Sequence, residues 1–175
     1  MNETNIFEQL AGIRAFVFDI DGVLTAGQVL VTEEGHQLRS VNIKDGYALQ
    51  HAVKLGYHVA VISGGRSQGM QHRFQGLGLS DIHLGQSHKV EAYEAFKAKH
   101  GLSDAQIAYM GDDMPDLPLL ERVGLPCCPA DACTDVLEAA TYISPIAGGY
   151  GCARELIERT LKIQGTWLSE ESHRW

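Results

Sequence analysis

The chain has 175 residues, 45% of them hydrophobic and 21% charged, and this balance predicts one globular domain over residues 1–175. Its formal net charge of -8 argues against a nucleic-acid or an anionic-membrane partner. No apolar run approaches the roughly 20 residues of a membrane span, and the N-terminus lacks a signal-peptide pattern, so we expect a cytoplasmic protein.

Apolar segments alternate with segments of helical period along most of the chain. This alternation predicts an α/β fold, a doubly wound, Rossmann-like parallel sheet with helices on both faces. Strands are expected at Ile13–Asp19, His58–Ser63, Ile82–Leu84, Ile107–Met110, Leu125–Cys128 and Tyr142–Ile143. Helices are expected at Gly46–Leu55, Ser67–Leu77, Lys89–His100, Asp116–Val123, Ala132–Ala139 and Cys152–Ile163.

One segment after the first strand breaks the alternation. Gln28–Thr32 and Gln37–Asn42 have strand-like patterns, and Glu33-Glu34-Gly35 between them would form the turn. We therefore expect a projecting hairpin over about residues 23–43 rather than a second domain. Because an isolated hairpin is marginal in water, it would pack against something, and a neighbouring subunit is one candidate.

Polar residues follow three of the predicted strands directly. In an open parallel sheet ligands bind beyond the carboxyl ends of the strands, so these residues should converge on one crevice. For any single aspartate the alternative is a solvated loop residue or a helix cap. The residues concerned are Asp19 and Asp21, then Ser63, Gly64 and Gly65, and finally Gly111, Asp112, Asp113 and Asp116.

A cluster of close carboxylates cannot stay ionised unaided. Two unit charges about 4 Å apart repel by about 4 kcal/mol at an effective dielectric constant near 20. A bound hard cation removes this penalty, and an all-oxygen ligand set without histidine or cysteine indicates Mg²⁺. Magnesium held by carboxylates is common where a phosphate group is handled.

The other residues near the predicted crevice suit phosphoryl transfer. Ser63 offers a hydroxyl to phosphate oxygens, and Lys89 adds a positive charge at the start of its helix. Asp19 would be the nucleophile that forms an aspartyl-phosphate. Asp21 would protonate the leaving alkoxide and later deprotonate the hydrolytic water. A phospho-accepting receiver domain uses similar groups, but its carboxylate pair would precede the acceptor, whereas the acceptor-like Asp19 comes first.

Other functional motifs find no support. The chain has no Gly-x-x-x-x-Gly-Lys-Ser/Thr loop, and Gly64-Gly65-Arg66-Ser67-Gln68-Gly69 does not match Gly-x-Gly-x-x-Gly, so nucleotide hydrolysis and dinucleotide binding lose support. The four cysteines form no Cys-x-x-Cys pair, so we expect reduced thiols rather than a metal or redox site. They are Cys127, Cys128, Cys133 and Cys152.

Four motifs, in their order along the chain, resemble those of the haloacid dehalogenase (HAD) superfamily, and the resemblance extends over nearly the whole chain. The matching stretches are Asp19-Ile20-Asp21-Gly22-Val23-Leu24-Thr25, Ser63, Lys89 and Gly111-Asp112-Asp113-Met114-Pro115-Asp116. The resemblance implies that Asp19, Asp21 and Asp112 hold Mg²⁺, with Asp21 binding through its backbone carbonyl. It also implies that Asp19 is the nucleophile, that Asp21 is the acid and base, and that Asp113 and Asp116 support the site.

The chain is too short for the inserted cap domains of many HAD phosphatases, and it is most similar to the capless phosphatases of 3-deoxy-D-manno-octulosonate 8-phosphate (KDO 8-phosphate). The likeness includes the hairpin, residues 41–47 and Ala147-Gly148-Gly149-Tyr150-Gly151. It implies hydrolysis of a small phosphorylated sugar acid in lipopolysaccharide precursor synthesis. It also implies a homotetramer whose hairpins and C-terminal tails, here residues 165–175, complete neighbouring sites. The implied substrate contacts are Asn42, Lys44, Asp45, Gly46, Gly64 and Arg73.

Three positions depart from that family's pattern. Gln50 and Tyr150 stand where arginine is frequent in that family. Arginine often follows the glycine after the serine directly, whereas here Gly65 separates Gly64 from Arg66. The 9-phosphate of a nine-carbon keto-deoxy sugar acid is therefore an alternative substrate. A catalytically silent assembly or regulatory domain is the alternative of another class, although the motif residues are intact. In the tail, Trp167 and Trp175 would either be disordered or anchor on a neighbouring subunit.

Overall fold

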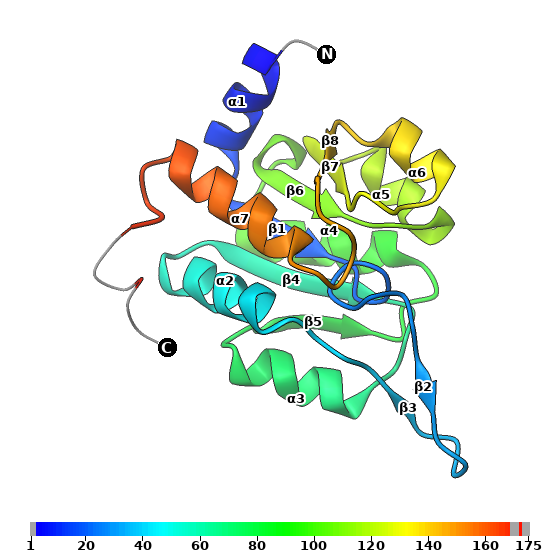
Figure 1. Cartoon of the computed structure of the whole chain (residues 1–175). Helices are drawn as coiled ribbons and strands as arrows, with labels where there is room; N and C mark the ends of the chain where they lie inside the picture. Colours follow the sequence, from blue (N-terminus) through cyan, green and yellow to red (C-terminus); the bar gives the residue numbers. More distant parts are fainter. Residues whose placement is uncertain (1–2, 169–171, 173–175) are drawn as a thin grey trace.

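A six-stranded sheet forms the centre of the computed structural model, which describes residues 3–168 and Ser172 (Figure 1). The strand order is β5-β4-β1-β6-β7-β8, and every neighbouring pair is parallel. The predicted doubly wound α/β architecture is therefore confirmed, without a cap domain among the described residues. The strands are β1 Ala15–Phe18, β4 His58–Ser63, β5 Asp81–Leu84, β6 Ile107–Met110, β7 Leu125–Cys128 and β8 Tyr142–Ile143.

Helices cover both faces of this sheet, and alternate side chains of β1 enter the two cores. Phe16 and Phe18 pack under α1 Glu3–Gly12, α2 Ile43–Lys54, α3 Gln68–Gly76 and α7 Cys152–Ile163. Ala15 and Val17 pack under α4 Lys89–His100, α5 Leu117–Leu120 and α6 Thr134–Ala139. All four strand residues are fully buried, which explains why β1 is a continuous apolar run. Within the described chain, no helix is long and apolar enough to cross a membrane.

The ends of two helices follow from local sequence. Gly101 ends α4 in the left-handed conformation, with φ of 62°, as a C-terminal glycine does. At α2 the helix begins at Ile43, three residues before the predicted start. Asn42 is its N-cap, and its side-chain Oδ1 accepts a hydrogen bond of 2.8 Å from the N–H of Lys44.

Several other elements differ from the sequence prediction, among them β1, which spans Ala15–Phe18 rather than Ile13–Asp19. Helix α1 was not predicted, and α6 begins at Thr134 rather than at Ala132. The predicted helix at Asp116–Val123 is shorter, because α5 covers only Leu117–Leu120 and Asp116 belongs to the preceding 3₁₀ turn, η2 Met114–Asp116. Pro118 has no N–H to donate to the carbonyl of Met114, so a continuous α-helix cannot run through this point. A second 3₁₀ turn, η1 Asp104–Gln106, precedes β6. All four cysteines are unpaired.

The predicted hairpin is present, although its strands are shorter than expected. β2 Leu30–Val31 pairs antiparallel with β3 Gln37–Leu38, and Figure 1 shows the two strands projecting from the body of the protein. Gly35 closes the turn with φ of 82° and donates its N–H to the carbonyl of Thr32. The hairpin exposes apolar side chains by 40% to 67%, namely Val29, Leu30, Val31 and Leu38.

The start of the C-terminal tail is anchored within the chain itself. Trp167 is 8% exposed, and its ring contacts the rings of Tyr47 and His51 edge-on. The Arg154 guanidinium lies 5.1 Å from the ring centroid of Trp167. Trp167 therefore packs on α2 and α7 of its own chain, whereas Trp175 lies outside the described residues.

Candidate active site

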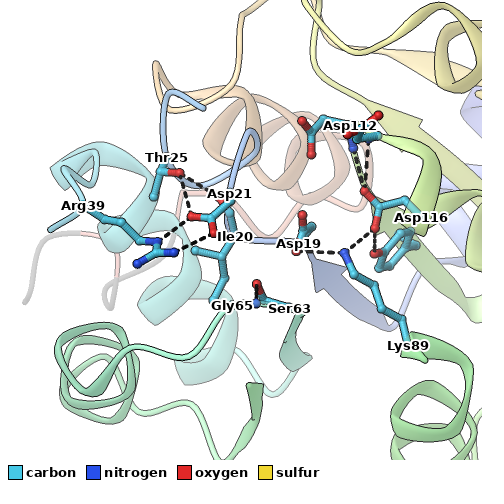
Figure 2. Close-up of polar contacts among 12 residues, drawn as sticks. Asp19, Ile20, Asp21, Thr25, Arg39, Ser63, Gly65, Lys89, Asp112 and Asp116 are labelled. Atoms are coloured by element: carbon cyan, nitrogen blue, oxygen red, sulfur yellow. Dashed lines mark hydrogen bonds and ion pairs between the residues drawn. The ribbon is translucent and has the colours of Figure 1, made fainter. Parts of the chain in front are cut away.

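Three carboxylates meet at the carboxyl ends of the central strands β1 and β6. Oxygen atoms of Asp19, Asp112 and Asp116 all lie within 4.8 Å of one another. Asp19 directly follows β1, and its N–H donates to the carbonyl of Met110 at the end of β6, with N and O 2.9 Å apart. The rule for open parallel sheets thus correctly predicted that these residues converge. Figure 2 shows the ammonium group of Lys89 between Asp19 and Asp116, with Asp112 on the far side of Asp116.

Lys89, the first residue of α4, joins two of these carboxylates. Its Nζ lies 2.9 Å from Oδ1 of Asp19 and 2.5 Å from Oδ1 of Asp116, and its side chain is 6% exposed. Asp116 also accepts hydrogen bonds from the hydroxyl of Tyr109 at 2.6 Å and from the N–H of Asp112 at 2.9 Å. Asp116 is therefore fully engaged, and it holds Lys89 and the start of the Asp112 loop in place.

The electrostatics of the cluster favour a bound cation. Burial and the charge of Asp116 raise the pKa of Asp19 to about 6, with Lys89 acting in the opposite direction. Burial and the charges of Asp19 and Asp116 raise the pKa of Asp112 to about 7. Against the effect of burial, the same two carboxylates raise the pKa of Lys89, so it stays charged. One ammonium group thus does not neutralise three carboxylates.

The donor set fits a hard divalent cation such as Mg²⁺. Oδ1 of Asp112 is buried and has no hydrogen-bond partner within the described chain. A buried carboxylate oxygen without a donor is costly unless a cation occupies its free side. Asp19 and Asp112 are the residues free to serve as ligands, because Asp116 is already engaged.

Asp21 lies apart from this cluster, and a residue that the sequence analysis missed holds its carboxylate. Arg39 Nε lies 2.6 Å from Oδ1 and Nη2 lies 2.9 Å from Oδ2, a bidentate ion pair (Figure 2). Thr25 Oγ1 is 3.5 Å from Oδ1. A usable sequence signal existed, since Arg39 is the only lysine or arginine between residues 22 and 43.

The end of β4 lies next to Asp21. Ser63 is 2% exposed, and its Oγ accepts a hydrogen bond of 3.2 Å from the N–H of Gly65. Gly64 between them is exposed at the mouth of the site. A Cβ at position 65 would lie 3.1 Å from Oδ2 of Asp21, which leaves little room for a side chain there. Gly65 thus lets the loop after Ser63 approach Asp21 closely.

A glycine-rich loop supports the Asp19–Thr25 segment from behind. Gly22 has φ of 91°, and a Cβ there would overlap the Asp112 carboxylate at 1.9 Å from Oδ2. A Cβ on Gly148 would lie 1.8 Å from the carbonyl oxygen of Gly22. Asp131 Oδ1 accepts a hydrogen bond of 2.8 Å from the N–H of Gly148. Residues 147–151 therefore fix the loop that carries Asp21.

The predicted substrate-contact residues fall into two groups. Asn42 caps α2, Lys44 is exposed, and Arg73 lies over Gly46, where a Cβ would be 2.4 Å from Arg73 Nη2. Asp45 differs, because it is 2% exposed and its Oδ1 accepts a hydrogen bond of 2.7 Å from the N–H of Arg154. The Asp45 side chain thus holds the start of α7, and its contact with the substrate stays a prediction.

The remaining motif aspartate, Asp113, has a structural role. It is exposed, and its Oδ1 accepts a hydrogen bond of 2.8 Å from the N–H of Met114. Asp113 therefore caps η2, the turn that brings Asp116 beneath the cluster.

Comparison with known proteins gives consistent matches. A family model described as haloacid dehalogenase-like hydrolase matches residues 75–156. The 3-deoxy-D-manno-octulosonate 8-phosphate phosphatase of Salmonella typhi is 34% identical over 162 residues, which are 93% of this chain and 86% of that protein. The crystal structure of the phosphatase of that name from Yersinia pestis matches with a TM-score of 0.90 at 33% identity, over 93% of this chain and 88% of that one. The Moraxella catarrhalis phosphatase in complex with a magnesium ion, a phosphate ion and KDO also matches with a TM-score of 0.90, at 32% identity over 94% of each chain.

Proposed function

Since the chain belongs to the haloacid dehalogenase-like hydrolases and, among them, to the KDO 8-phosphate phosphatase family, we propose that it hydrolyses KDO 8-phosphate to KDO and inorganic phosphate. The observation that carries the proposal is the convergence of Asp19, Asp112 and Lys89 at the ends of β1 and β6. A nucleophilic carboxylate, a site for a cation and a fixed ammonium group are what phosphoryl transfer to an aspartate requires.

Asp19 is the proposed nucleophile. Lys89 engages Oδ1 of Asp19, which leaves Oδ2 free to attack phosphorus. A bond forms between Oδ2 and phosphorus as the bond from phosphorus to the sugar oxygen breaks, and Asp21 gives its proton to that oxygen. Asp21 then takes a proton from water, which attacks phosphorus, releases phosphate and restores Asp19. The Ser63 hydroxyl donates to a phosphate oxygen throughout.

Mg²⁺ is the proposed cofactor, held by Asp19, Asp112 and the backbone carbonyl of Asp21. When bound, it supplies positive charge that draws the phosphate to the nucleophile and offsets the charge that develops on it. Asp113 and Asp116 support these residues, through the cap of η2 and the contact with Lys89 respectively.

The sugar acid would lie over the N-terminus of α2. In this proposal Asn42, Lys44 and Gly46 contact the substrate, together with Gly64 and Arg73. The exposed Lys44 and the guanidinium of Arg73 above Gly46 supply positive charge for an anionic substrate. Asp45 supports the N-terminus of α2 through its hydrogen bond with the N–H of Arg154 in α7.

The test is release of phosphate from a panel of sugar phosphates, with and without Mg²⁺. We expect Mg²⁺-dependent turnover with the highest kcat/KM for KDO 8-phosphate, and Asp19→Asn should abolish it in a folded protein. Higher kcat/KM for a nine-carbon keto-deoxy acid 9-phosphate would favour the alternative substrate. A folded oligomer that hydrolyses neither these compounds nor a generic aryl phosphate would instead favour the silent assembly domain.

We also propose that the hairpin mediates self-association into a homotetramer, with a second copy of the chain covering its apolar residues. Four exposed apolar side chains on so small an element favour association with another surface, and in a monomer they would stay in contact with water. Leu30→Asp should reduce the mass measured by light scattering, whereas Gln28→Asp, a new charge at a neighbouring polar position, should not. An unchanged tetramer in Leu30→Asp would contradict this role. Such an enzyme would act in the cytoplasm, which suits four unpaired cysteines.

A further inference from the structure

We propose that Arg39 positions Asp21 for proton transfer, and that the hairpin is therefore part of the catalytic apparatus as well as an association surface. This inference rests on the phosphatase function proposed above. Arg39, at the end of the hairpin, forms an ion pair with Asp21, the proposed acid and base (Figure 2).

The geometry of the ion pair fixes the orientation of the Asp21 carboxylate. Arg39 contacts both oxygens, with Nε at 2.6 Å and Nη2 at 2.9 Å, and two parallel hydrogen bonds from a planar guanidinium restrict rotation of the carboxylate. The Arg39 side chain is 5% exposed, whereas that of Asp21 is 36% exposed. Nη1 of Arg39 is buried without a partner in the described chain, so the guanidinium is dedicated to Asp21.

The two carboxylate oxygens of Asp21 have different surroundings. Oδ1 accepts from Arg39 Nε and lies 3.5 Å from Thr25 Oγ1, whereas the one hydrogen-bond donor to Oδ2 within the described chain is Arg39 Nη2, at 2.9 Å. Oδ2 faces the loop after Ser63, because a Cβ at Gly65 would lie 3.1 Å from it. Oδ2 is thus turned toward the phosphate side of the site, and it is the oxygen available to the leaving group and to water.

Arg39 also connects this orientation to the hairpin, since it directly follows β3. Within the described chain, its pair with Asp21 is the only side-chain hydrogen bond or ion pair between residues 28–40 and the rest of the protein. A displacement of the hairpin would therefore move Arg39, and Asp21 would lose its fixed orientation.

The proposal predicts a selective kinetic defect. A general acid must lie within hydrogen-bond reach of the leaving oxygen, and its full contribution is about 10²–10⁴-fold. A sugar alkoxide needs that proton, whereas p-nitrophenolate leaves without it. Hydrolysis of the aspartyl-phosphate requires the base with either substrate. A poorly oriented Asp21 should therefore slow every step except the first step with the aryl ester.

The experiment compares wild type, Arg39→Ala, Arg39→Lys and the exposed control Arg122→Ala by rapid-quench kinetics with Mg²⁺. In Arg39→Ala the burst of p-nitrophenolate should stay within about 3-fold of wild type, while steady-state turnover and the first turnover of the sugar phosphate fall about 10–100-fold. Added guanidinium ion should restore part of the loss. Arg39→Lys should be intermediate, and Arg122→Ala unchanged.

Two results would overturn the inference while leaving the phosphatase function standing. One is an Arg39→Ala enzyme with normal turnover of the sugar phosphate. The other is a burst that falls as much as the steady-state rate, because general damage to the site slows both steps. A wild-type protein that releases no phosphate from any ester would overturn the proposed function and this inference together.

Discussion

The affinity of the carboxylate cluster for Mg²⁺ should fall as the pH is lowered from 8 to 6. Without the cation, the pKa of Asp19 is about 6 and that of Asp112 about 7, both raised first by burial and then by neighbouring carboxylates. A cation binds only the ionised carboxylates, so it must displace whatever protons they hold. Binding should therefore release protons, and more of them at lower pH.

The size of the effect follows from these two pKa values. Their titration gives a release of about 0.1 proton per Mg²⁺ at pH 8 and about 1.4 protons at pH 6. Over the same interval the dissociation constant should rise about 20-fold, equivalent to about 1.8 kcal/mol.

Isothermal titration calorimetry measures both quantities when it is repeated in buffers of different ionisation enthalpy. Asp112→Asn should lower the release at pH 6 to about 0.5 proton or less, since only Asp19 then remains to titrate. Asp135→Asn, which removes an exposed carboxylate in the first turn of α6, should behave as wild type. A dissociation constant for the wild type that is the same at pH 8 and pH 6 would show that the cluster stays ionised without a cation, and the reasoning would be wrong.

Three further predictions concern stability. Gly148→Ala should lower the free energy of unfolding by about 3 kcal/mol in urea titrations, because its Cβ would meet backbone at 1.8 Å, whereas Gly12→Ala, with open space around it, should not. Trp167→Ala should lower the free energy of unfolding by about 3 kcal/mol and lower the Tm. Leu168→Ala, at a side chain that is 79% exposed, should change both little. Equal effects of the two substitutions would contradict the anchoring role of Trp167. Burial raises the pKa of Asp45 from 3.8 to about 6, so ionisation of the folded protein should cost up to about 3 kcal/mol of stability as the pH rises from about 4 to about 7. Asp45→Asn should flatten that dependence, and an unchanged pH profile would refute the assignment.

The sequence was sufficient to predict the sheet and the carboxylate cluster. Strand β1 is buried on both faces, so its apolar run is continuous, and the carboxyl ends of parallel strands always share one edge. Both inferences depend on local pattern and on a topological rule. Lys89 was predicted for a similar reason, because it begins the helix that follows β5, a strand of the same parallel sheet.

The contacts that the sequence did not reveal are tertiary. The pair between Arg39 and Asp21 depends on where the hairpin returns to the sheet, and no spacing rule gives that direction. Asp45 looked like a polar group at a helix start, yet the packing of α7 against α2 buries it. Helix α1 was not predicted, because its packing on α7 joins residues at opposite ends of the chain and no local sequence pattern indicates that contact.

The central position of β1 affects how the protein is made. This strand emerges from the ribosome before either of its neighbours, since β4 begins at His58 and β6 at Ile107. At roughly 5–20 residues per second, the side chains of Ala15–Phe18 wait several seconds for the first partner and longer for the second. Folding during synthesis therefore begins with a fully buried apolar strand that has neither of its partners, and the nascent chain should depend on chaperones until β6 has been translated.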